Sequence, residues 1–151
     1  MNKALIIFDP GSEAARRCVR QLHRLHPSDT VAIGEGRRVE IARYGVVVLV
    51  SSISAGAIAH SRSFLDYWDD LRYKPVIMVL AGAAPADHPV YSQVYENEMP
   101  PSIRGHLIFF KISAPALRGY LDRFLALFPM VSDPAIETQL QPVSSCIRAY
   151  L

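Results

Sequence analysis

The chain has 151 residues, half of them apolar and a fifth charged, which is the composition of one globular domain with a sizeable core. Its 16 basic and 14 acidic side chains leave a formal net charge of +2, and this argues against a nucleic-acid-binding protein, because such proteins carry a strongly basic surface. No apolar run approaches the roughly 20 residues that span a bilayer, and no signal-peptide core precedes the first acid and proline, which favours a cytoplasmic protein without a membrane span.

The N-terminal part of the chain predicts a strand, a helix and a second strand. Residues 4–8 form a continuous apolar run, and residues 30–33 form a weaker one. Between them, apolar residues recur at three- and four-residue steps, which indicates an amphipathic helix with Ser12 as its N-cap and Pro27 as its end. Three arginines at four-residue spacing mark its outer face: Arg16, Arg20 and Arg24. We interpret them as a solvated face, with a docking patch for an acidic partner as the alternative.

The middle of the chain predicts two more strands around a second helix. Residues 46–50 are the purest apolar run, and residues 75–80 are another. The segment 35–44 before the third strand is shorter than parallel crossovers usually need. A helix over 58–71 is expected to bury four apolar side chains and expose four charged ones: Phe64, Leu65, Trp68 and Leu71, and Arg62, Asp66, Asp69 and Asp70.

The C-terminal part predicts a fifth strand at residues 106–110 and a helix over 115–128, with Phe124 buried. The tail, residues 131–151, contains Pro134 and Pro142, so we expect it to form at most short helices. None of the five strands alternates apolar with polar residues, and each should therefore be covered on both faces, as in a parallel sheet between helices. We expect a single α/β domain over residues 1–151.

Ligands of an open parallel sheet bind beyond the carboxyl ends of its strands. Three loops are expected at that edge, comprising residues 9–13, 51–57 and 81–88. The second is rich in serine and glycine, and the third in alanine. Such residues provide hydroxyl groups and close backbone approach for a ligand, although they are equally typical of a simple turn.

A family resemblance runs through residues 3 to 128. The stretch from Val48 to Gly56, followed by Phe64, resembles the third strand and flavin loop of flavodoxins. It is most similar to the branch that contains the menaquinone-dependent protoporphyrinogen oxidase, as are residues 97–100, 107–110 and 120–124. The resemblance implies a flavodoxin-like three-layer sandwich with a five-stranded parallel sheet in the order 2-1-3-4-5. It also implies FMN as cofactor, and electron transfer or an FMN-dependent oxidoreductase activity with a redox partner protein or a small-molecule substrate.

The resemblance assigns FMN to the three loops, whose candidate residues are Gly11, Ser12, Ser51, Ser52, Ser54, Ala55, Gly56, Gly82 and Ala83. The first loop departs from the family pattern, because Ser12 is its only hydroxyl and two carboxylates, Asp9 and Glu13, flank it and would repel a phosphate. Arg16 or Arg17 is a candidate counter-charge, or simply a surface arginine. Ala55 stands where the branch has an aromatic residue. No catalytic residue is indicated.

Other chemistry is weakly indicated or not at all. Tyr91 and Tyr95 either stack on a flavin or are surface or half-core tyrosines. Cys18 and Cys146 stand at no metal-binding or redox spacing, so we expect small buried hydrophobic residues. The five histidines show no metal spacing, and P-loop, dinucleotide and nucleophile-elbow motifs are missing. The alternative to a flavoprotein is a flavodoxin-like binding or scaffolding module that lacks FMN.

Overall fold

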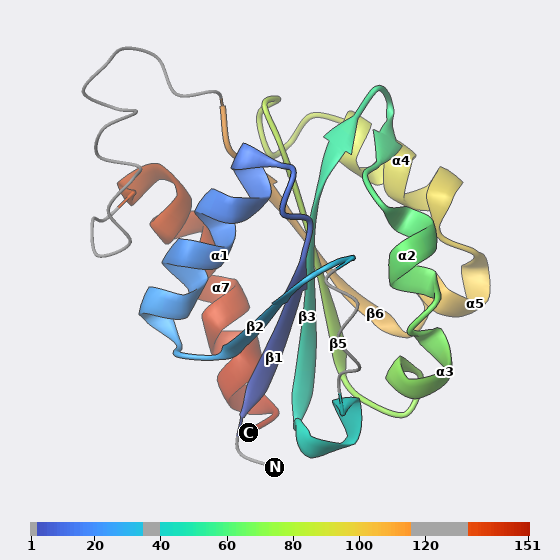
Figure 1. The fold of residues 1–151 in the computed structure, drawn as a ribbon. Coiled ribbons are helices and arrows are strands. Elements are labelled where there is room, and N and C mark those ends of the chain that lie inside the picture. The colour runs from blue at the N-terminus through green and yellow to red at the C-terminus, as the bar shows by residue number, and fades with distance from the viewer. Residues whose placement is uncertain (1–2, 35–39, 116–132) are drawn as a thin grey trace.

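The apolar runs form a parallel β-sheet in the computed structural model, which describes residues 3–34, 40–115 and 133–151. Its parallel strands are β1 (Ala4–Phe8), β2 (Asp29–Ala32), β3 (Val46–Ser54), β5 (Val76–Gly82) and β6 (Leu107–Ser113). They lie side by side in the order β2-β1-β3-β5-β6 (Figure 1). All five predicted strands are therefore confirmed, and the order of these five is the predicted one.

The sheet nevertheless has six strands rather than the five predicted, because β3 continues past the expected loop. It turns back at Ala55 and Gly56 into β4 (Ala57–Ile58), which pairs antiparallel with it. The two turn residues have φ angles of 51° and 77°, and positive φ at both central positions is what a two-residue hairpin of this kind requires. The segment predicted as a loop is thus mostly strand and hairpin.

Helices cover both faces of the sheet (Figure 1). One face carries α1 (Glu13–Leu25) and α7 (Pro134–Ala149), and the other carries α2 (Ser61–Leu65), α3 (Trp68–Leu71), α4 (Val90–Glu98) and α5 (Pro101–Arg104). A short 3₁₀ helix, η1 (Ile41–Arg43), precedes β3. Successive strand residues enter opposite cores, so that Ile6 packs with the α1–α7 side and Ile7 with the other. Burial on both faces explains the continuous apolar runs of the central strands β1, β3 and β5. The edge strands β2 and β6 are mostly exposed or half-buried, so the prediction that all five are covered on both faces is wrong for these two.

Helix α1 follows its sequence pattern closely. Ser12 is its N-cap and accepts a hydrogen bond from the backbone nitrogen of Ala15 at 3.1 Å. Cys18 and Leu22 lie on the inner face of this helix and are fully buried. Burial raises the pKa of the Cys18 thiol to about 12. Cys18 is therefore an uncharged core residue, as predicted, whereas Cys146 is only half-buried. On the outer face, Arg24 forms an ion pair with Glu137 of α7 at 3.1 Å.

The predicted helix over 58–71 is wrong in its extent. Its first residue belongs to β4, and the rest divides into α2 and α3, because hydrogen bonds from Tyr67 to Phe64 and from Asp70 to Tyr67 form separate turns. Phe64 and Leu71 are buried, and the four charged residues are exposed, as predicted. Leu65 and Trp68 are half-buried instead of buried. The edge of the Trp68 ring meets His106, with 5.2 Å between centroids.

The predicted absence of a long C-terminal helix is also wrong, because α7 has 16 residues. Pro134 occupies its first turn, where a missing N–H group costs nothing, and Pro142 lies within it. The helix aligns four fully buried side chains: Ile136, Leu140, Val143 and Ile147. Burial of each stabilises the fold by about 1.5–3 kcal/mol, and together they outweigh the roughly 3 kcal/mol cost of an interior proline. The helix predicted over 115–128, with Phe124, lies outside the described residues.

Candidate functional site

A crevice opens at the carboxyl-terminal edge of the sheet, where ligands of this architecture bind. It lies between the N-terminus of α1, the ends of β3 and β5, and the residue after β6, and its volume is about 190 Å³. Its walls are mostly small side chains, with one acid and one arginine: Ser12, Glu13, Ala14, Arg17, Ser52, Ile53, Gly82, Ala83 and Ala114. The topology thus brings together Ser12, Ser52, Gly82 and Ala83 of the predicted site residues.

The loop after β1 is held by its own aspartate. Asp9 is 3% exposed, and its Oδ1 accepts a hydrogen bond from the backbone nitrogen of Gly11 at 2.9 Å. The same oxygen lies 3.3 Å from Nε2 of His60. Gly11 is exposed beside this contact and does not line the crevice. Asp9 does not line it either, so of the two carboxylates expected beside a phosphate, only Glu13 does.

Ser51 and Ser52, near the end of β3, point to opposite faces of the sheet, because successive strand residues alternate. Ser51 donates its hydroxyl hydrogen to the carbonyl of Ala59 at 2.7 Å and is fully buried away from the crevice. Ser52 is 7% exposed and lines the crevice. Its hydroxyl has no hydrogen-bond partner among the described residues. The hydroxyl opens to the crevice, where a ligand group would be able to accept its hydrogen.

The remaining predicted residues of the second loop lie apart from this crevice. Ser54, Ala55 and Gly56 are exposed at the β3–β4 hairpin, and none lines the cavity. The two tyrosines also lie elsewhere: Tyr91 is fully buried and Tyr95 is 8% exposed. The ring of Tyr95 stacks on Phe109, with 3.9 Å between centroids. Both tyrosines are therefore core residues, more deeply buried than the surface or half-core positions predicted as the alternative to flavin stacking.

Tyr91 supports the crevice wall through its contact with Gly82. Its hydroxyl donates to the carbonyl of Ala84 at 2.6 Å and lies 3.3 Å from that of Ile112. Burial raises the pKa of this phenol, so the donor keeps its proton at neutral pH. The ring lies against Gly82, where an added Cβ would come within 3.0 Å of the tyrosine oxygen. A side chain at Gly82 therefore needs Tyr91 to shift by a few tenths of an ångström.

Replacing Gly82 with alanine should lower the free energy of unfolding by about 1–3 kcal/mol, the usual cost of an over-packed core. Gly105→Ala is the matched control, because its new Cβ would have an ordinary contact of 3.6 Å to a carbonyl and a helical φ of −65°. Chemical denaturation of both variants measures the difference. An equal stability for Gly82→Ala and wild type would show that the Tyr91 ring shifts to accommodate the new Cβ without loss of stability.

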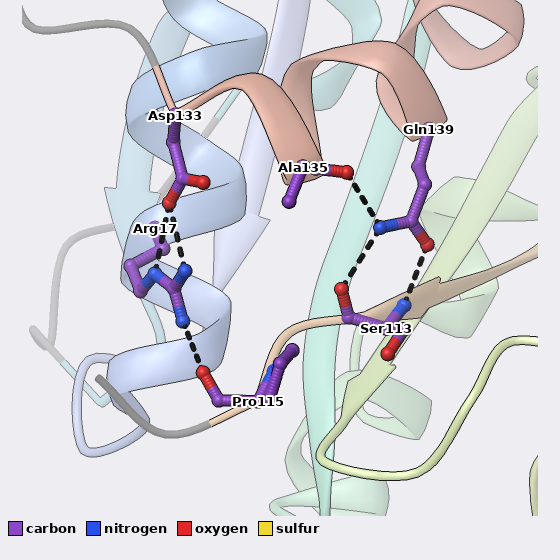
Figure 2. A network of polar contacts seen from close by, with 6 residues as sticks. All are labelled: Arg17, Ser113, Pro115, Asp133, Ala135 and Gln139. Atoms are coloured by element: carbon purple, nitrogen blue, oxygen red, sulfur yellow. Dashed lines mark hydrogen bonds and ion pairs between the residues drawn. The ribbon is translucent and has the colours of Figure 1, made fainter. Parts of the chain in front are cut away.

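Arg17 of α1 lines the crevice, and Figure 2 shows its polar contacts. It is 6% exposed. Its Nε and Nη2 donate to Oδ2 of Asp133 at 3.0 and 2.8 Å, and Nη1 donates to the carbonyl of Pro115 at 2.7 Å. Close by, the side chain of Gln139 pairs with both backbone groups of Ser113 at the end of β6, at 2.7 and 2.9 Å. These contacts fasten α7 to α1 and to the sheet edge.

Several lining residues were not among the predicted ones. Ile53 and Ala114 carry no polar signal, so their sequence context could not have indicated them. Arg17 appeared only as one of two alternative counter-charges, and the structure distinguishes it from Arg16, which is exposed and donates to the carbonyl of Pro10. Within the described residues, no cluster of three His, Cys, Asp or Glu side chains could hold a metal ion. No helix among those residues is long and apolar enough to cross a membrane.

No protein-family model matches the sequence, and no curated protein matches it significantly. Solved structures do share its fold. A flavoprotein in complex with FMN from Lactobacillus acidophilus NCFM has a TM-score of 0.54 at 13% identity, covering 75% of this chain and 93% of that one. Two-electron reduced flavodoxin from Megasphaera elsdenii has a TM-score of 0.52 at 10% identity, covering 94% and 98%.

A third structure, an NAD(P)H:quinone oxidoreductase from Methanothermobacter marburgensis, has a TM-score of 0.51 at 8% identity and covers 97% of each chain. Identities this low establish shared architecture only. The strand order and the helical layers on both faces of the sheet agree with this shared architecture. This chain has the flavodoxin-like α/β fold.

Proposed function

We propose that this chain is a flavoprotein that binds FMN with the phosphate in the crevice and functions in electron transfer or as an oxidoreductase. The observation that carries the proposal is the hydroxyl of Ser52, which has no partner among the described residues and lines a crevice beside the N-terminus of α1. The first N–H groups of a helix lack partners within the helix and carry positive partial charge, so they favour a phosphate.

The crevice residues fit the phosphate end of FMN. Gly82, Ala83 and Ala114 leave space beside the donors. The volume of about 190 Å³ is below the roughly 300–1,000 Å³ typical of a pocket that encloses a whole small ligand. It therefore suits one end of the cofactor, and we place the ring toward the predicted segment 52–56. When bound, FMN supplies electron uptake and release, while the chain supplies orientation and electrostatics.

The proposal leaves a redox partner protein or a small-molecule substrate as the other reactant. Membership of the branch containing the menaquinone-dependent protoporphyrinogen oxidase is the finer prediction, based on residues 48–56 and 97–100. Oxidation of a porphyrinogen by the FMN-loaded protein is its test.

Titration of the protein into FMN tests the cofactor directly. We expect flavin fluorescence to change with saturation, and a purified protein that carries FMN should release it on denaturation. Riboflavin, which lacks the phosphate, serves as the comparison ligand. No change in fluorescence at FMN concentrations of about 1 mM, the weak end of the affinity scale, would refute FMN binding.

Glu13→Gln should tighten FMN binding by up to about tenfold. Glu13 lines the crevice, and a carboxylate at roughly 8 Å opposes a phosphate by on the order of 2 kcal/mol at an effective dielectric of about 20, before salt screening. Asp66→Asn, at an exposed position beside α2, is the control with the same change of net charge. Isothermal titration at low salt measures both. Equal affinities for Glu13→Gln and wild type would place the phosphate elsewhere.

A second candidate function is a binding or scaffolding module without flavin. Two contacts favour it: Asp9 already accepts the N–H group of Gly11 in the first loop, and Asp133 already neutralises Arg17. Both reduce the number of free donors that a phosphate would meet. A protein that is colourless as purified and unresponsive to FMN would support this second function.

A further inference from the structure

We propose that Arg17 determines the specificity of the crevice by selecting ligands that carry a phosphate dianion over their uncharged counterparts. The inference rests on the proposed function, because it concerns the same crevice. It adds a specific residue and a measurable ligand preference, which the fold alone does not imply.

Arg17 has hydrogen-bonding capacity left over for a ligand. A guanidinium group carries five N–H donors in a fixed plane. The three hydrogen bonds of Arg17 in Figure 2 use one N–H group each of Nε and Nη2, toward Asp133, and one of Nη1, toward the carbonyl of Pro115. Two N–H groups therefore have no partner among the described residues, on a side chain that is 6% exposed and forms part of the crevice wall.

The same contacts hold the arginine in one orientation. Asp133, which precedes the first residue of α7, accepts from two of its nitrogens, and Pro115 accepts from the third (Figure 2). Holding a long side chain in place before binding removes part of the entropy cost that a surface arginine would incur on contacting a ligand. Arg16 is exposed, and its one hydrogen bond within the described part of the chain goes to the carbonyl of Pro10, so it lacks this restraint.

Ser52 provides an independent indication that an acceptor belongs in the crevice. The residue is more than nine-tenths buried, and its hydroxyl has no partner among the described residues. It lines the same cavity as Arg17 and the start of α1. The hydroxyl, the free guanidinium N–H groups and the helix N-terminus are all donors. Phosphate oxygens accept from each of them, and charge-assisted bonds to arginine are the strongest of the three.

The balance of charge in the crevice also favours an anion. Glu13 opposes one, but this residue is exposed, and water and salt screen an exposed charge. Arg17 is buried and is screened much less. Asp133 offsets part of its charge, yet the carboxylate lies on the α7 side and is not part of the crevice wall.

The test compares the affinities for FMN and riboflavin in three proteins. We expect the wild type to bind FMN about 10- to 100-fold more tightly than riboflavin, the contribution of one charged hydrogen-bonded contact. In Arg17→Gln the ratio should fall to within about twofold, mainly through lost FMN affinity. Arg24→Gln is the matched control, because it also removes an arginine of α1 paired to an acid of α7, and its ratio should equal that of the wild type.

Asp133 is half-buried and loses its partner in Arg17→Gln, and a partly desolvated carboxylate without a partner lowers stability. The double variant Arg17→Gln with Asp133→Asn removes both charges and avoids this. A ratio that is unchanged in either variant, or a wild type that does not distinguish FMN from riboflavin, would overturn the role of Arg17.

Inorganic phosphate separates this inference from the proposed function. Phosphate should raise the thermal unfolding temperature of the wild type and of Arg24→Gln above that in chloride at equal ionic strength, but not that of the Arg17 variants. A phosphate effect that depends on Arg17, without flavin binding, would refute FMN as cofactor and leave the anion selectivity standing. Flavin binding without any phosphate effect would leave FMN as cofactor standing and would refute the anion selectivity of Arg17. Failure of both measurements would overturn both.

Discussion

Leu140→Ala should lower the free energy of unfolding by about 2–5 kcal/mol, the cost of deleting a fully buried leucine side chain. Leu140 is 0% exposed and belongs to the core between α1, α7 and the sheet. The adjacent Gln141→Ala is the control, because Gln141 is exposed on the same helix and its replacement should change stability by no more than about 0.5 kcal/mol. Urea unfolding at equilibrium measures both. A loss below about 1 kcal/mol for Leu140→Ala would mean that α7 contributes little to the core.

Pro142→Ala is expected to have the opposite sign and to raise stability by about 2 kcal/mol. An interior proline costs a helix about 3 kcal/mol, because it removes an N–H group and crowds the preceding turn. Pro142 is exposed within α7, so its ring contributes no buried packing. The gain is reduced by about 0.4–1 kcal/mol, since alanine leaves the unfolded chain more freedom.

Pro134→Ala provides the control for this prediction. Pro134 occupies the first turn of the same helix, where the missing N–H group has no intrahelical partner in any case. Its replacement should therefore not stabilise the protein. Thermal and urea unfolding of the two variants give the comparison. If Pro142→Ala were destabilising, the proline ring would have a role in packing that its exposure does not show.

The two acids of the first loop illustrate how the candidate site differs from its sequence-based description. The sequence indicated two equal carboxylates beside a phosphate. In the fold, Asp9 faces the α2 side and binds its own loop and His60, whereas Glu13 remains at the crevice. Only Glu13 is therefore a useful position for improving anion binding. The same reasoning separates Arg17 from Arg16, which are neighbours in sequence but differ in burial.

The sequence by itself determined the strands, the burial of the three central ones and the first helix. Four of the apolar runs are local and clear, the run at residues 30–33 is weaker, and the Ser12 cap with its apolar stripe lies within one helix. These features follow from periodicity and capping, which need no distant partner. The parallel sheet and the edge at which a ligand would bind follow in turn, because continuous apolar strands require cover on both faces.

Only the tertiary structure decided that α7 and the β3–β4 hairpin form and that Arg17 lines the crevice. The spacing of Ile136, Leu140, Val143 and Ile147 is helical, but Pro134 and Pro142 argue locally against a helix, and the burial that outweighs them depends on α1 and the sheet. Arg17 acquires its role from Asp133, which is 116 residues away. Contacts between segments so far apart leave no trace in local pattern, because their energy exists only once the chain has folded.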